Sequence, residues 1–177
     1  MSNGIIKRLV EIPTGEVEEL SKAVEIAIEQ ERIARDFYKR NAQKTSDSEI
    51  KNAFTFLVKE EQEHFDALNA IKDSLKKEGK FAIISEEALK HLPKPKIYPG
   101  DKEKLKSEKK ENELTVLLWA MHAERKAELF YKKQAEKTGS NDVKEFFEIL
   151  AEFEAEHYEY LDGIFSSWTD TSDFIMG

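Results

Sequence analysis

FTFLVKEEQEHFDALNAI, residues 54–71, has the spacing of an amphipathic helix, yet two side chains on its inward face are ionisable. The inward positions are Phe54, Leu57, Glu61, His64, Leu68 and Ile71. An ionised carboxylate that faces a helical core without a partner costs several kcal/mol or takes up a proton. The position of Glu61 therefore predicts a compensating charge nearby, for which a metal ion is the simplest candidate.

The same pattern returns 93 residues later, since position 147 corresponds to position 54. The inward positions of the second copy are Phe147, Leu150, Glu154, His157, Leu161 and Ile164. The preceding helix is repeated as well, with Glu31, Arg32, Ala34, Phe37, Tyr38, Lys39 and Ala42 matched by Glu124, Arg125, Ala127, Phe130, Tyr131, Lys132 and Ala135. This interval far exceeds the roughly 20–50 residues of solenoid repeats, so two helical hairpins should pack on each other.

Each hairpin offers one glutamate from its first helix and a Glu-x-x-His motif from its second helix. A Glu and a His three residues apart project from the same helical face, so both can reach one site. The candidate metal ligands are Glu31, Glu61, His64, Glu124, Glu154 and His157. Four carboxylates would balance two divalent ions with both imidazoles neutral, which favours a dinuclear site that needs both hairpins.

This arrangement resembles the ferritin-like di-iron and di-manganese carboxylate proteins, which use the same distribution of ligands over four helices. The resemblance implies an all-α fold, a ferritin-like four-helix bundle made of two duplicated antiparallel helical hairpins joined by a long crossover. We expect a single domain over residues 1–177. Its parts are hairpin 1 at about 16–77, the crossover at about 79–111, hairpin 2 at about 113–165 and a non-helical tail at 166–177. The crossover can run along the bundle or pass hairpin 2 to a neighbouring chain, so domain swapping stays open.

The composition narrows the function further. A formal net charge of −8 argues against nucleic acid as a partner, because phosphate binding needs a concentrated positive surface. The apolar run at residues 4–12 is too short for a signal peptide, and no run of about 18 apolar residues predicts a membrane helix, so we expect a cytoplasmic protein with no membrane partner. The absence of cysteine excludes thiolate-bound iron within this chain, so electrons must come from another molecule.

Tyr38 and Tyr131 are the candidate catalytic residues, and neither would bind the metal directly. They follow Glu31 and Glu124 by seven residues and lie on the same inward face. One interpretation is that both are core aromatics whose hydroxyls bond to any nearby acceptor. The other is that they donate hydrogen bonds to a ligand carboxylate or to bound oxygen.

Other conspicuous residues have simpler interpretations. Glu128 lies one turn after the third-helix ligand and is a possible additional ligand, although a solvated or salt-bridged carboxylate is the alternative. We expect Glu60 and Glu63, which flank the first Glu-x-x-His motif, to be solvated. Trp119 and Trp168 are interpreted as packing residues rather than electron relays.

At these positions the sequence resembles the rubrerythrin family. The segments EQERIARDFY at 29–38 and HAERKAELFY at 122–131 are similar to its ligand helices, and EEQEH at 60–64 and EFEAEH at 152–157 are similar to its Glu-x-x-His helices. The resemblance covers about residues 16–165 and implies that the six candidates bind iron, with Glu61 and Glu154 bridging two metals. Rubrerythrins also carry a four-cysteine rubredoxin domain and a further ligand Glu three residues after the third-helix Glu. This chain has no cysteine, and Ala127 occupies the position of the further ligand Glu.

The resemblance implies a non-haem di-iron oxidoreductase that reduces hydrogen peroxide with electrons from an external donor such as a rubredoxin-like protein. Its cofactors would be two iron ions, Fe²⁺ or Fe³⁺, although oxygen and nitrogen ligands also accept manganese or zinc. Hydrogen peroxide or dioxygen would be its substrate, and we expect a homodimer. A ferritin-like iron-storage protein and a dimanganese catalase-like enzyme are the alternatives.

Overall fold

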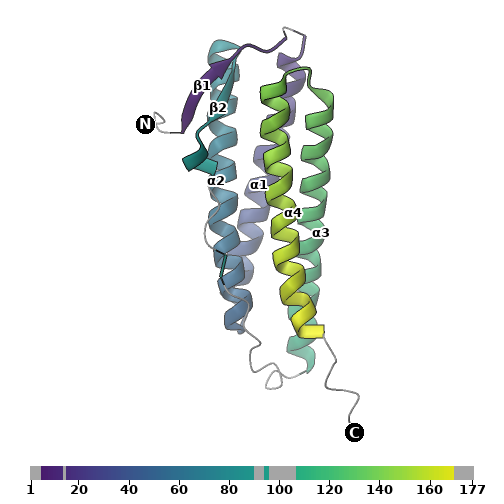
Figure 1. Ribbon diagram of the computed structural model, residues 1–177. Helices are drawn as coiled ribbons and strands as arrows, with labels where there is room; N and C mark the ends of the chain where they lie inside the picture. The colour runs from purple at the N-terminus through teal and green to yellow at the C-terminus, as the bar shows by residue number, and fades with distance from the viewer. Residues whose placement is uncertain (1–4, 14, 90–93, 96–106, 170–177) are drawn as a thin grey trace.

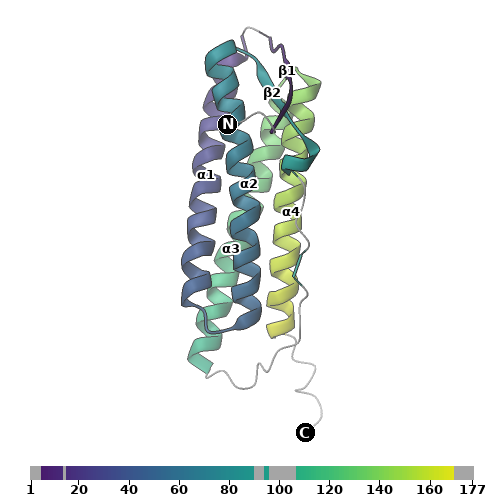
Figure 2. The same ribbon diagram turned by 90° about the vertical axis from the view of Figure 1, so that its left-hand side faces the viewer.

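Four long helices form one bundle, as Figure 1 shows for the described residues 5–13, 15–89, 94–95 and 107–169 of the computed structural model. The helices are α1 (Val17–Lys44), α2 (Ser48–Glu78), α3 (Ser107–Lys137) and α4 (Asn141–Thr169). Consecutive helices pair as two antiparallel hairpins, α1 with α2 and α3 with α4 (Figures 1 and 2). The predicted ferritin-like bundle of two hairpins is therefore confirmed.

The ends of α2 follow from local chemistry that the sequence predicts. The Asp47 side chain accepts a hydrogen bond from the Ile50 amide at 2.9 Å, which satisfies an amide in the first turn that has no helical partner. Gly79 ends the helix at φ 65°, a left-handed conformation that glycine adopts without steric cost, and its amide donates to the Leu75 carbonyl.

Two predicted helix limits are wrong. Helix α3 begins at Ser107 rather than near residue 113, because the charged run before Leu114 consists of good helix formers although it has no apolar period. Helix α4 continues to Thr169, so the predicted non-helical tail at 166–177 is wrong for its first residues. Trp168 lies one turn after Ile164, is 2% exposed and extends the buried stripe. The rest of that tail and most of the crossover lie outside the described residues.

Two short strands also escape the all-helical prediction. Strand β1 (Ile6–Val10) pairs antiparallel with β2 (Phe81–Ile84), with Val10 opposite Phe81. β2 packs against α2 and α4, and Phe81 is fully buried. The small sheet therefore covers one end of the bundle on the α2 and α4 side (Figure 2).

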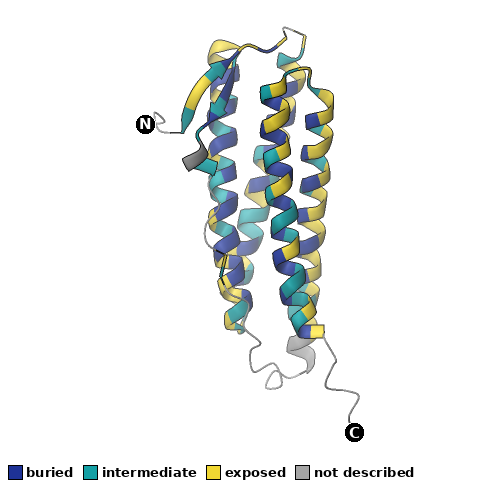
Figure 3. Cartoon of the chain, in the orientation of Figure 1, coloured by how far each residue is buried: buried dark blue, intermediate teal, exposed yellow. Residues whose placement is uncertain are grey.

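The inward heptad positions form the core, and Figure 3 shows the buried residues following the inner side of each helix. Phe54, Leu57 and their counterparts Phe147 and Leu150 are at most 1% exposed. Trp119 is different, because 67% of it is exposed, so its interpretation as a packing residue is wrong within this chain. Over the described residues, no helix combines the length and the hydrophobicity needed to cross a membrane.

Candidate metal centre

All six candidate ligands converge inside the bundle, and each is at most 2% exposed. Helix α1 supplies Glu31, α2 supplies Glu61 and His64, α3 supplies Glu124, and α4 supplies Glu154 and His157. Their donor atoms form two groups of four residues, and within each group the atoms lie within 4.8 Å of one another. Glu61 and Glu154 belong to both groups, so these two carboxylates lie between the two positions that a metal pair would take.

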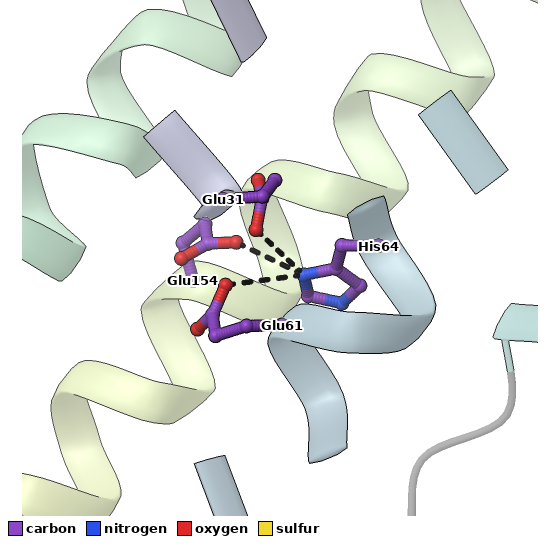
Figure 4. Close-up of side chains that lie close together, drawn as sticks. All are labelled: Glu31, Glu61, His64 and Glu154. Atoms are coloured by element: carbon purple, nitrogen blue, oxygen red, sulfur yellow. Dashed lines mark ion pairs between the residues drawn. The ribbon is translucent and has the colours of Figure 1, made fainter. Parts of the chain in front are cut away.

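Both histidines turn Nδ1 toward the carboxylates. The Nδ1 atom of His64 lies 3.4 Å from Glu31 Oε2 and 3.4 Å from Glu154 Oε1 (Figure 4). The Nδ1 atom of His157 lies 3.3 Å from Glu61 Oε1. The three-residue spacing puts each histidine about one turn beyond its own motif glutamate on the same helical face, so both side chains reach the same centre.

Several buried polar atoms of this cluster lack a hydrogen-bond partner within the part of the chain that the structure describes. They are both carboxylate oxygens of Glu61, Oε1 of Glu154, Nδ1 of His64 and both ring nitrogens of His157. A buried polar atom without a partner costs about 1–3 kcal/mol. Divalent cations bound on the Nδ1 side would satisfy all of them except Nε2 of His157, so the donor set fits a pair of metal ions.

Without metal, protons compensate the clustered charge. Burial and repulsion from Glu154 raise the pKa of Glu124 to about 8, and burial and the same repulsion raise the pKa of Glu61 well above its usual range. Burial disfavours a charged His64, but Glu154 and a second carboxylate outweigh it and raise its pKa to about 9. The pKa of His157 is raised in the same way. Burial opposes ionisation of Glu154, yet its proton-bearing neighbours lower its pKa.

The two tyrosines contact ligands across the bundle rather than along their own helix. The Tyr38 hydroxyl of α1 donates to Glu124 Oε1 of α3, and the Tyr131 hydroxyl of α3 donates to Glu31 Oε1 of α1. Burial and the neighbouring carboxylates raise the pKa of both phenols, so both remain protonated donors. The geometry agrees with the interpretation in which each tyrosine positions a ligand.

Glu60 is not solvated as predicted, and its burial makes the two halves of the site unequal. It is 2% exposed, and its Oε2 lies 3.7 Å from Nε2 of His157. The duplicated position is Phe153, whose ring stacks on His64 with the centroids 5.2 Å apart. Nε2 of His157 therefore faces a carboxylate, whereas the ring of His64 stacks on an apolar ring. The difference between Glu60 and Phe153 at duplicated positions is the sequence signal that indicates two unequal halves.

Glu128 does not join the cluster among the residues that the structure describes. It is 2% exposed and accepts from Arg125 Nη1 at 2.5 Å and from Lys132 Nζ at 2.6 Å. These two cations hold the pKa of Glu128 below its usual value in spite of burial. Glu128 is therefore a salt-bridged carboxylate and not an additional metal ligand. It does not replace the ligand Glu that is missing at position 127, where this chain has Ala127.

The comparison with known families bears on the same residues. The family model of rubrerythrin matches residues 9–72 and 79–165, which is most of the chain and includes all six candidate ligands. The chain belongs to the rubrerythrin family. No curated protein and no solved structure matches it. Rubrerythrins are ferritin-like di-iron proteins and generally oxidoreductases, and this member has buried Glu and His groups that could hold a metal.

Replacing Glu60 by Gln should weaken one metal position and spare the other. Glu60 Oε2 lies 3.7 Å from Nε2 of His157, which is beyond hydrogen-bond distance but close enough for the two charges to interact. Groups behind a ligand histidine are typically worth about 10–100-fold in metal affinity. We expect a cobalt titration followed by visible absorption and calorimetry to become biphasic in Glu60→Gln. The matched variant Glu63→Gln, on the same helix but partly exposed, should titrate like the wild type. Two unchanged, equal sites in Glu60→Gln would contradict this role for Glu60.

Proposed function

We propose that this rubrerythrin is a di-iron oxidoreductase that reduces peroxide with electrons from a separate redox protein. The observation that supports this most is the pair of four-residue groups that share Glu61 and Glu154. Two iron ions held side by side would supply one electron each, which matches the two electrons needed to break an O–O bond.

The residues of this chain would divide the work between holding metal and controlling protons. Glu31 and His64 would hold one ion, Glu124 and His157 the other, and the shared carboxylates would lie between them. Tyr38 and Tyr131 fix the outer oxygens of the two unshared carboxylates. Because both phenols keep their protons, they are also donors within reach of the centre. Reduction of hydrogen peroxide to two water molecules consumes two protons as well as two electrons.

An external electron donor is part of the proposal. The chain contains no cysteine, so it cannot form the four-thiolate iron centre that would make electron transfer self-contained. Each turnover would leave both irons oxidised, and a one-electron carrier such as a rubredoxin-like protein would have to reduce them again.

The proposal predicts that the anaerobically prepared diferrous protein is oxidised by one equivalent of hydrogen peroxide faster than by dioxygen. Stopped-flow absorption of the ferric product measures both rates. A matched sample loaded with redox-inert zinc should leave peroxide unchanged. Two-iron protein that does not react with peroxide would refute the proposal. Uptake of many irons per chain would indicate storage, and oxygen evolution without a reductant would indicate a catalase-like reaction.

A further inference from the structure

The α1 and α3 side of the bundle carries an unusual apolar surface. Every large apolar side chain that is strongly exposed among the described residues lies on these two helices. They are Ile26, Ile33, Leu118, Trp119 and Leu129. The small β-sheet packs on α2 and α4 instead, so within the described residues nothing covers the seam between α1 and α3.

A cavity of about 250 Å³ opens in this seam and ends at the candidate metal centre. Its mouth lies beside Ile33 and Trp119, which are 52% and 67% exposed. Its walls include Ala34, Ala127 and Phe37, and its floor is formed by the four ligand carboxylates. Ala34 and Ala127 are duplicated counterparts on α1 and α3, so small side chains on both helices leave this space open.

The cavity is larger and more apolar than hydrogen peroxide requires. A water molecule takes about 30 Å³ in the liquid, and hydrogen peroxide has only one more oxygen atom. Cavities for drug-sized ligands begin at about 300 Å³, so this one suits a smaller organic molecule. Its methyl and aromatic walls favour an apolar group, whereas the carboxylate floor favours a polar end that reaches a metal ion.

From this combination we infer that the site takes organic hydroperoxides, with the apolar group in the cavity and the O–O group at the metal pair. The inference rests on the proposed function and names its substrate class. The reaction is ROOH + 2 e⁻ + 2 H⁺ → ROH + H₂O. The O–O bond breaks, one O–H bond forms on each oxygen, and two ferrous ions each lose one electron. The external one-electron donor then reduces both irons.

Binding can be measured without turnover. Zinc-loaded protein is titrated with 2-phenyl-2-propanol, the alcohol product of cumene hydroperoxide, while tryptophan emission is followed, to which Trp119 at the cavity mouth contributes. Ile33→Glu places a charge at the mouth and should weaken binding by about tenfold, since it replaces apolar contact area. Ile26→Glu is the matched control, because Ile26 lies on the same helix, is 51% exposed and is not part of the cavity lining.

Wild type and Ile26→Glu should bind the alcohol equally, and Ile33→Glu should bind it weakly. Equal affinity in all three proteins, or no binding to the wild type, would overturn the inference. Sedimentation of the same proteins tests another occupant of this surface. If both substitutions dissociate a dimer and abolish alcohol binding together, the seam is an interface between copies of the chain and the inference is also overturned.

Reactivity separates this inference from the proposed function. Diferrous wild type should be oxidised by both cumene hydroperoxide and hydrogen peroxide, and Ile33→Glu should lose rate mainly with cumene hydroperoxide. Oxidation by hydrogen peroxide alone would overturn the organic substrate and leave the proposed function standing. Reaction with neither peroxide would overturn both.

Discussion

Glu154→Gln is expected to weaken both metal positions, although it removes only one charge. Glu154 Oε1 lies 3.4 Å from Nδ1 of His64, and its Oε2 lies 3.8 Å from Nδ1 of His157. The substitution therefore removes an anionic oxygen from both metal positions. The loss in affinity should exceed the roughly 10–100-fold that follows removal of a group that merely supports a ligand.

Metal analysis and thermal melting measure this effect together. At metal concentrations about 100 times Kd, each bound ion should stabilise the wild type by about 2.7 kcal/mol, so one ion alone should raise Tm by roughly 5–10 °C and two ions by more. Glu154→Gln should retain fewer than two ions per chain and show almost no metal-dependent rise. Glu152→Gln is the matched control, because Glu152 is exposed on the same helix. A Glu154→Gln protein that keeps two ions and the full rise in Tm would exclude Glu154 as a shared ligand.

The convergence of the six candidate ligands could be predicted because helical periodicity and the duplication both constrain it. Glu61 and Glu154 occupy the same inward position in the two copies of the repeat. When two such hairpins pack as a four-helix bundle, equivalent positions lie at the same height along the bundle axis. No spacing in the sequence specifies which helix lies behind each ligand. The contact between Glu60 of α2 and His157 of α4 depends on that neighbour relation, so the sequence alone predicts a solvated Glu60.

The strands and the exposed apolar seam depend on longer-range relations. Strands β1 and β2 have five and four residues, too few for a clear alternation, and two complete helices separate them in the chain. Trp119 lies on α3, where an apolar side chain at the edge of the inward stripe looks the same whether a neighbouring helix covers it or not. Only the arrangement of α1 beside α3 shows that it borders a cavity.

The metal-free cluster should release protons when it binds metal. At neutral pH, Glu124 with a pKa of about 8 and His64 with a pKa of about 9 hold protons, and Glu61 and His157 have pKa values raised in the same direction. Ligand atoms must be deprotonated to bind a metal ion. Loading two divalent ions at pH 7 should therefore release about two protons from Glu124 and His64, and the raised pKa values of Glu61 and His157 add to this number. Calorimetry in buffers of different ionisation enthalpy measures this number.

The same protonation fixes the pH dependence of the metal-free protein. The folded pKa of Glu124 lies above its ordinary value of 4.5, so its contribution to stability is complete below pH 4.5 and is lost as pH rises to about 8. The contribution of His64 is lost between its ordinary value of 6.5 and about 9. The lowered pKa of Glu154 acts in the opposite direction, but only below pH 4.5. Stability should therefore fall as pH rises from 5 to 9.

Thermal melts across this range test the prediction, with a decrease in Tm of more than about 10 °C expected for the metal-free protein. The metal-loaded protein should change much less, because its ligands no longer carry the titrating protons. Glu63→Gln serves as the control, since Glu63 lies outside both ligand groups. A metal-free Tm that rises with pH, or metal binding that releases less than one proton, would mean that the four carboxylates are already ionised without metal. Protons and metal ions would then not be alternative ways of balancing the same buried charge.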